Sequence, residues 1–95
     1  MLTSKQRAKL RGLANKLNSV FQIGKGGIND MLLSQTAELL ELRELVKLSV
    51  LETAPVTARE AADEMSKALS CDVVQVIGSK FILYKESKDH KTIKL

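Results

Sequence analysis

The chain has 95 residues, of which 44% are hydrophobic and 27% charged, and its formal net charge is +4. This length suits one domain with one modest core over residues 1–95, and the composition is that of a folded globular chain. No apolar run reaches the roughly 20 residues of a membrane span, and the single cysteine, Cys71, excludes an internal disulfide. The N-terminal residues lack the apolar segment of a signal peptide, so we expect a cytoplasmic protein without a membrane partner.

The charges are distributed unevenly along the chain. Residues 1–28 contain six basic and no acidic residues, residues 29–72 contain four basic and nine acidic residues, and residues 73–95 contain five basic and two acidic residues. The two basic segments meet if the chain ends lie close together, as domain termini often do. We therefore expect a basic face that binds a polyanion.

The first predicted element is an amphipathic helix. Thr3-Ser4-Lys5-Gln6 is a capping box, and leucine and alanine then recur at helical spacing as far as Leu17. Basic residues flank the apolar face on both sides, with Gly12 among them: Lys5, Lys9 and Lys16 on one side, Arg7 and Arg11 on the other. Asn18 and Ser19 end this helix, and residues 20–23 are typical of a short strand.

A glycine-rich loop, Gly24-Lys25-Gly26-Gly27, joins that strand to a second predicted helix. Asn29 is a suitable N-cap for this helix, which keeps its apolar spacing to about Glu44. Residues 45–51 then alternate apolar and polar side chains. This pattern predicts a strand with one solvent-exposed face that carries Lys47 and Ser49.

The last third of the chain predicts a third helix and a hairpin. Thr57 opens a second capping box, and residues 73–77 and 81–85 flank a short turn that contains Gly78. We expect the lysine-rich tail, residues 86–95, to fray. The element order α-β-α-β-α-β-β predicts an α/β fold in which a small mixed four-stranded sheet packs with three helices.

The glycine loop has two interpretations. Backbone N–H groups at a helix N-terminus and the positive end of the helix dipole suit a phosphate, the missing side chains admit a sugar–phosphate backbone, and Lys25 adds a cation. KH domains use a GXXG loop in this way. The alternative is a plain strand-to-helix turn. The basic segment without acidic residues that leads into the loop favours nucleic-acid binding.

Several short stretches together resemble the CRM domain, the RNA-binding module named for chloroplast RNA splicing and ribosome maturation, and above all its single-domain bacterial members. The resemblance covers about residues 2–85. It is carried by Leu2-Thr3, Leu10-Arg11-Gly12-Leu13-Ala14, Ile23-Gly24-Lys25-Gly26-Gly27-Ile28, Glu44-Leu45-Val46-Lys47, Val76-Ile77-Gly78 and Ile82-Leu83-Tyr84-Lys85. One departure is Lys85, where the family commonly has arginine, whose planar fork is lost.

The resemblance implies a fold similar to the C-terminal domain of bacterial translation initiation factor three, with a KH-like GXXG loop. It also implies RNA binding and an association with precursors of the large ribosomal subunit. By this resemblance the glycine loop contacts RNA and the first helix lines the adjoining surface. The residues that we expect to bind RNA are Gly24, Lys25, Gly26, Gly27, Lys5, Lys9, Lys16, Arg7, Arg11 and Lys47.

The leading hypothesis is therefore a non-catalytic protein that binds ribosomal RNA and assists ribosome assembly, with no cofactor, metal or small-molecule substrate. An alternative is a protein-interaction module that docks a basic ribosomal protein through its acidic helices. The acidic residues concerned are Asp30, Glu38, Glu41, Glu60, Asp63 and Glu64. An enzyme is the least supported class, because His90 lies in the predicted tail and Cys71 has no evident activating partner.

Overall fold

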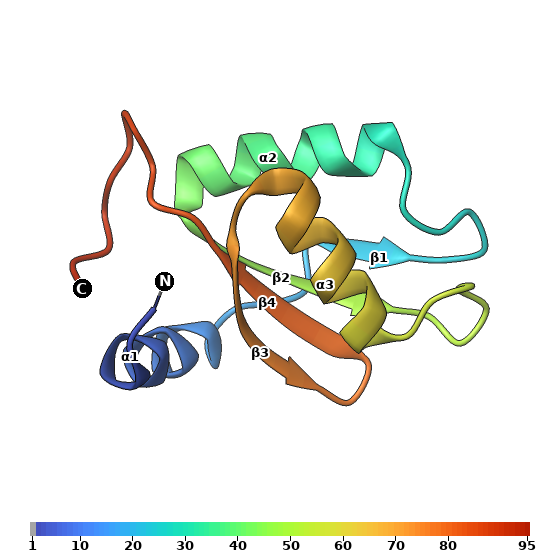
Figure 1. The fold of residues 1–95 in the computed structure, drawn as a ribbon, viewed down its shortest axis with the longest axis horizontal. Coiled ribbons are helices and arrows are strands. Elements are labelled where there is room, and N and C mark those ends of the chain that lie inside the picture. The colour runs from blue at the N-terminus through green and yellow to red at the C-terminus, as the bar shows by residue number, and fades with distance from the viewer. Residues whose placement is uncertain (1) are drawn as a thin grey trace.

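The computed structural model describes residues 2–95 and contains three helices and one four-stranded sheet (Figure 1). The elements are α1 (Ser4–Ala14), β1 (Phe21–Ile23), α2 (Asp30–Arg43), β2 (Leu45–Val50), α3 (Ala58–Leu69), β3 (Asp72–Ile77) and β4 (Lys80–Tyr84). The strand order in the sheet is β1-β2-β4-β3, with β1 parallel to β2 and the other neighbours antiparallel. The predicted α/β class, the element order and the mixed sheet are thus confirmed.

Local capping interactions begin each helix where the sequence predicts. The hydroxyl of Thr3 accepts a hydrogen bond from the N–H of Gln6 at 3.1 Å, and Thr57 and Glu60 form the second capping box in the same way. The end of α1 was predicted wrongly. The helix ends at Ala14, so Lys16 lies beyond it and does not continue the helical stripe of Lys5 and Lys9.

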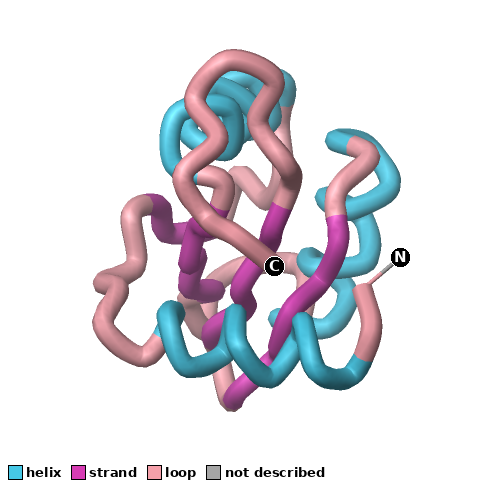
Figure 2. Tube along the Cα trace, turned by 90° about the vertical axis from the view of Figure 1, so that its left-hand side faces the viewer, coloured by secondary structure: helices cyan, strands magenta, loops and turns pink. Residues whose placement is uncertain are grey.

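The helices cover both faces of the sheet, and each face has its own apolar core. α2 and α3 pack on one face over a core that includes Leu48, Met65 and Phe81, whereas α1 packs on the opposite face through Leu10 and Ala14. Figure 2 shows the strands with α1 running along one side of the sheet and the other two helices on the other side. The sheet is therefore the middle layer of three.

The prediction that β2 has one solvent-exposed face is wrong. Leu45 is buried beneath α1, and Ser49 is only 8% exposed. β2 is an inner strand of the sheet, and Ser49 pairs with Gln22 on one side and Lys80 on the other.

The C-terminal tail does not fray, because Glu44 holds it. The side chain of Glu44 is fully buried. Its carboxylate accepts hydrogen bonds from the backbone N–H groups of Ser87 at 2.9 Å, Thr92 at 2.6 Å and Ile93 at 2.9 Å. Burial would raise the pKa of Glu44, but these hydrogen bonds outweigh it and lower that pKa.

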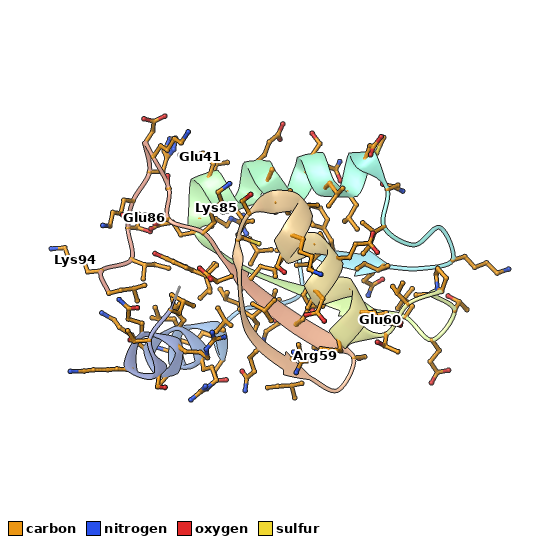
Figure 3. The ribbon with its side chains drawn as sticks, in the orientation of Figure 1. Glu41, Arg59, Glu60, Lys85, Glu86 and Lys94 are labelled. Carbon is orange, nitrogen blue, oxygen red and sulfur yellow. The ribbon has the colours of Figure 1, made fainter. Side chains whose placement is uncertain are left out.

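Glu41, one helical turn earlier, holds the outer part of the tail (Figure 3). Its carboxylate accepts hydrogen bonds from the Ser87 hydroxyl at 2.5 Å and from the N–H groups of Lys88 and Asp89, each at 3.1 Å. These bonds lower the pKa of Glu41 from 4.5 to about 2. We call Glu41, Glu44 and residues 87–93 the tail clip.

The clip brings the C-terminal tail next to α1, which is the condition under which the two basic segments meet. The Lys9 ammonium donates a hydrogen bond to the carbonyl of Lys94, and Ile93 packs against the core beneath α1. The start of α1 and the last residues of the tail lie at the same end of the molecule in Figure 1. The two basic segments therefore adjoin each other.

Candidate nucleic-acid interface

The glycine loop is a tight turn whose tip is open. The N–H of Gly27 donates to the carbonyl of Gly24 at 2.9 Å, which leaves Lys25 and Gly26 exposed at the two central positions. A Cβ on Gly27 would lie 3.1 Å from Cγ of Pro55, and Gly27 has a φ of +64°. A Cβ on Gly26 would meet no heavy atom within 4 Å. The turn itself therefore requires Gly27, whereas Gly26 is open to a partner.

The N-terminus of α2 is a weaker phosphate site than the sequence suggests. The side-chain oxygen of Asn29 already accepts a hydrogen bond from the N–H of Leu32 at 2.8 Å. Asp30 places a carboxylate in the first turn, at the positive end of the helix dipole. Attraction for a phosphate at this turn therefore depends on Lys25 and the open backbone.

The residues expected to bind RNA fall into two groups that lie far apart. The turn between β1 and α2 lies at one end of the longest dimension of the molecule, which measures 36 Å, and α1 lies at the other end (Figure 1). The structure does not bring the glycine loop and the basic residues of α1 into one compact site. A ligand that contacts both groups has to extend across the molecule.

Three of the basic residues are committed to contacts within the fold. The guanidinium of Arg7 is half-buried and donates to the carbonyls of Val73 and Val74 in β3. The ammonium group of Lys47, also half-buried, donates to the carbonyl of Leu17 at 3.0 Å. Lys9 contacts the tail, as described above.

The other four basic residues remain available to a ligand. Within residues 2–95, no hydrogen bond or ion pair involves their side chains. They are Lys5, Arg11, Lys16 and Lys25. All except the partly exposed Arg11 are exposed.

A strip of uncovered sheet links the two groups, and it contains a cation that the sequence analysis missed. Gln22, Ser49, Lys80 and Ile77 are neighbours across the four strands. They lie on the face that α1 covers only in part, and all except Ser49 are exposed. Lys80 shares this face with Ile82, which α1 buries, because alternate residues of a strand point to the same side of the sheet. The local sequence pattern therefore does not show that α1 leaves Lys80 uncovered.

The sequence analysis also singled out Cys71 and Lys85, and the structure defines their surroundings. Burial and the charge of Asp72 raise the pKa of the Cys71 thiol to about 11, so this thiol stays protonated at neutral pH. The Lys85 ammonium donates to the carbonyl of Leu69 at the end of α3, at 2.9 Å. The described part of the chain has no cluster of three metal-ligating side chains, and no helix there is long and apolar enough to span a bilayer.

Comparisons with known proteins agree with this architecture. The chain is 46% identical over its full length to the probable RNA-binding protein YqeI of Bacillus subtilis, covering 99% of that protein, and 30% identical over 90 residues to an RNA-binding protein of Haemophilus influenzae, covering 91% of it. The solution structure of a Staphylococcus aureus protein described as a candidate RNA-binding protein superposes with a TM-score of 0.82 at 46% identity, covering 100% of this chain and 99% of that one. Residues 2–85 match the CRS1 / YhbY (CRM) domain. The chain therefore belongs to the CRM-domain family, alongside its single-domain bacterial members.

Proposed function

We propose that this protein binds RNA without catalysing a reaction, and that its ligand is ribosomal RNA in cytoplasmic precursors of the large ribosomal subunit. The observation that supports RNA binding most strongly is the open tip of the glycine turn, where Lys25 and Gly26 face solvent and no side chain fills the space beside Gly26. The relatives named as RNA-binding proteins support the same ligand class. Ribosomal RNA is the ligand that the family resemblance implies.

The RNA contacts the turn, crosses the uncovered strip of the sheet and reaches α1. Five cations lie along this path without a partner in residues 2–95: Lys25, Lys80, Arg11, Lys16 and Lys5. Aromatic stacking contributes little, because Phe81 and Tyr84 are buried in the cores. Recognition therefore depends on the phosphate backbone and on RNA shape more than on unstacked bases.

The salt dependence of RNA affinity tests this path. If all five cations contact phosphates, the logarithm of the association constant falls with the logarithm of salt concentration at a slope of about −3.5 for single strands and about −4.5 for duplex RNA. Fluorescence anisotropy over a series of salt concentrations measures the slope. Affinity that does not change with salt would contradict the proposed path.

The identity of the RNA is tested by crosslinking in cells, with bound sites read at nucleotide resolution and compared with gradient fractions of ribosomal particles. We expect crosslinks to concentrate in large-subunit ribosomal RNA and in fractions that hold immature particles. Crosslinks spread over messenger RNA would contradict the assembly role while leaving RNA binding intact. The alternative of docking a basic protein through acidic helices is less favoured, because two of its six carboxylates are engaged within the fold, Glu41 in the tail clip and Glu60 in the capping box of α3.

A further inference from the structure

An apolar groove lies apart from the glycine turn and borders the proposed RNA path at Lys16. It has a volume of about 640 Å³ and is formed by the end of α1, the segment that follows it, the end of α2, β2 and the clipped tail. Its apolar lining consists of Leu13, Leu17, Val20, Leu42, Leu45, Val46 and Ile93. Leu13, Val20 and Leu42 are 41%, 36% and 54% exposed. Three separate segments bring these exposed aliphatic side chains together, and a contiguous apolar patch rimmed by polar residues is typical of an interaction site.

All charged side chains that line the groove are basic. They are Lys16, Arg43 and Lys47, and no aspartate or glutamate lines it. Lys47 donates to the carbonyl of Leu17, whereas Lys16 and Arg43 make no ion pair within residues 2–95. The surface is thus aliphatic at its floor and positive at its rim.

We propose that this groove docks an acidic amphipathic helix of a partner protein. Leucine-like side chains at i, i+3 or i+4, and i+7 would cover Leu13, Val20 and Leu42, and carboxylates on the flanks of the helix would face Lys16 and Arg43. RNA fits the groove less well, because the aliphatic floor cannot hydrogen-bond to a phosphate and would strip water from it. The polarity is opposite to the sequence-based alternative, in which acidic helices of this chain bind a basic partner.

The tail clip builds one wall of this groove. Thr92 and Ile93 line it, and the carboxylate of Glu44 holds both of their N–H groups. The groove is therefore fixed in shape before a partner arrives, which lowers the entropic cost of docking.

The probe that tests docking is a synthetic helical peptide of about 16 residues, about 24 Å long, with leucine on one face and glutamate elsewhere. Two-dimensional NMR of the full chain should show saturable shifts at the amides of Leu13, Val20 and Leu42. The matched peptide with lysine in place of glutamate should not bind. Leu42→Glu should weaken binding by about tenfold or more, since it removes an anchor and adds a repelling charge.

Met31→Glu is the matched control, because Met31 is also on α2, is 69% exposed and does not line the groove. It should leave peptide affinity unchanged, and both variants should keep the wild-type melting temperature. Equal binding of the lysine peptide, or shifts centred elsewhere, would overturn the proposal. Loss of RNA affinity in Leu42→Ala, which adds no charge near Lys16, would assign the groove to RNA. Capture of a second copy of this chain by a photo-crosslinker at Leu42 would assign it to self-association. Either result also overturns the proposal.

Discussion

Replacing Glu44 with glutamine tests how far the tail clip stabilises the fold. In the wild-type protein the carboxylate holds three backbone N–H groups, from Ser87, Thr92 and Ile93. Glutamine keeps one carbonyl oxygen but turns an NH₂ group toward at least one of these donors. Hydrogen bonds to a charged group contribute about 1.5–3 kcal/mol each and neutral ones about 0.5–1.5 kcal/mol.

One bond is lost and two are weakened, but the desolvation cost of a buried charge is also removed and the released amides reach water. We therefore expect Glu44→Gln to lower the free energy of unfolding by about 2–3 kcal/mol. For a domain of this size that corresponds to a fall in melting temperature of roughly 10–20 °C. Urea unfolding followed by circular dichroism measures the change. Glu38→Gln, at an exposed position on α2, the helix that Glu44 caps, should change stability by less than about 0.5 kcal/mol. A loss below about 0.5 kcal/mol in Glu44→Gln would refute the clip as a source of stability.

Three further predictions concern the glycine loop, α1 and the tail clip. Gly26→Ala should weaken RNA binding without changing the melting temperature. Gly27→Ala should lower the free energy of unfolding by about 1–2 kcal/mol, because Gly27 has a positive φ and a Cβ there would contact Pro55. Equal melting temperatures of the two variants would contradict the turn geometry. Gly12→Ala should raise stability by about 1 kcal/mol in urea unfolding, since a Cβ there meets nothing within 4 Å and alanine favours the helix. The pKa of Glu41 is lower in the folded state than its ordinary 4.5, so its stabilising effect is present above pH 4.5 and is lost as pH falls toward about 2. NMR of the tail amides should show release in that range, and release near pH 6 would contradict the contacts.

The sequence predicts well those elements that depend on interactions between residues close together in the chain. Thr3, Asn29 and Thr57 cap helices through side chains that bond to residues three positions away, so a short window of sequence contains both partners. The alternation of Val46, Leu48 and Val50 likewise identifies their common core face.

The features that the sequence could not give depend on contacts between distant residues. From the sequence, Glu44 is only a charged residue at the end of a helix. The fold shows that its carboxylate accepts hydrogen bonds from N–H groups more than 40 positions away. Every residue except proline has a backbone N–H group, so the sequence does not show which of these groups will meet a carboxylate. For this reason the tail was expected to fray. Arg7 and Lys47 were expected to meet RNA for a similar reason. A count of charges does not show which cations already bind carbonyls of their own fold.

RNA affinity of the Lys25→Ala variant tests the central claim most directly, because Lys25 is the exposed cation at the tip of the glycine turn and has no partner within residues 2–95. The matched control is Lys67→Ala, which removes an exposed lysine from α3, away from the proposed path. We expect Lys25→Ala to weaken binding and to reduce the magnitude of the salt slope by about 0.7–0.9, with Lys67→Ala unchanged in both. Equal affinities and slopes for wild type and both variants would contradict the assignment of the turn to RNA.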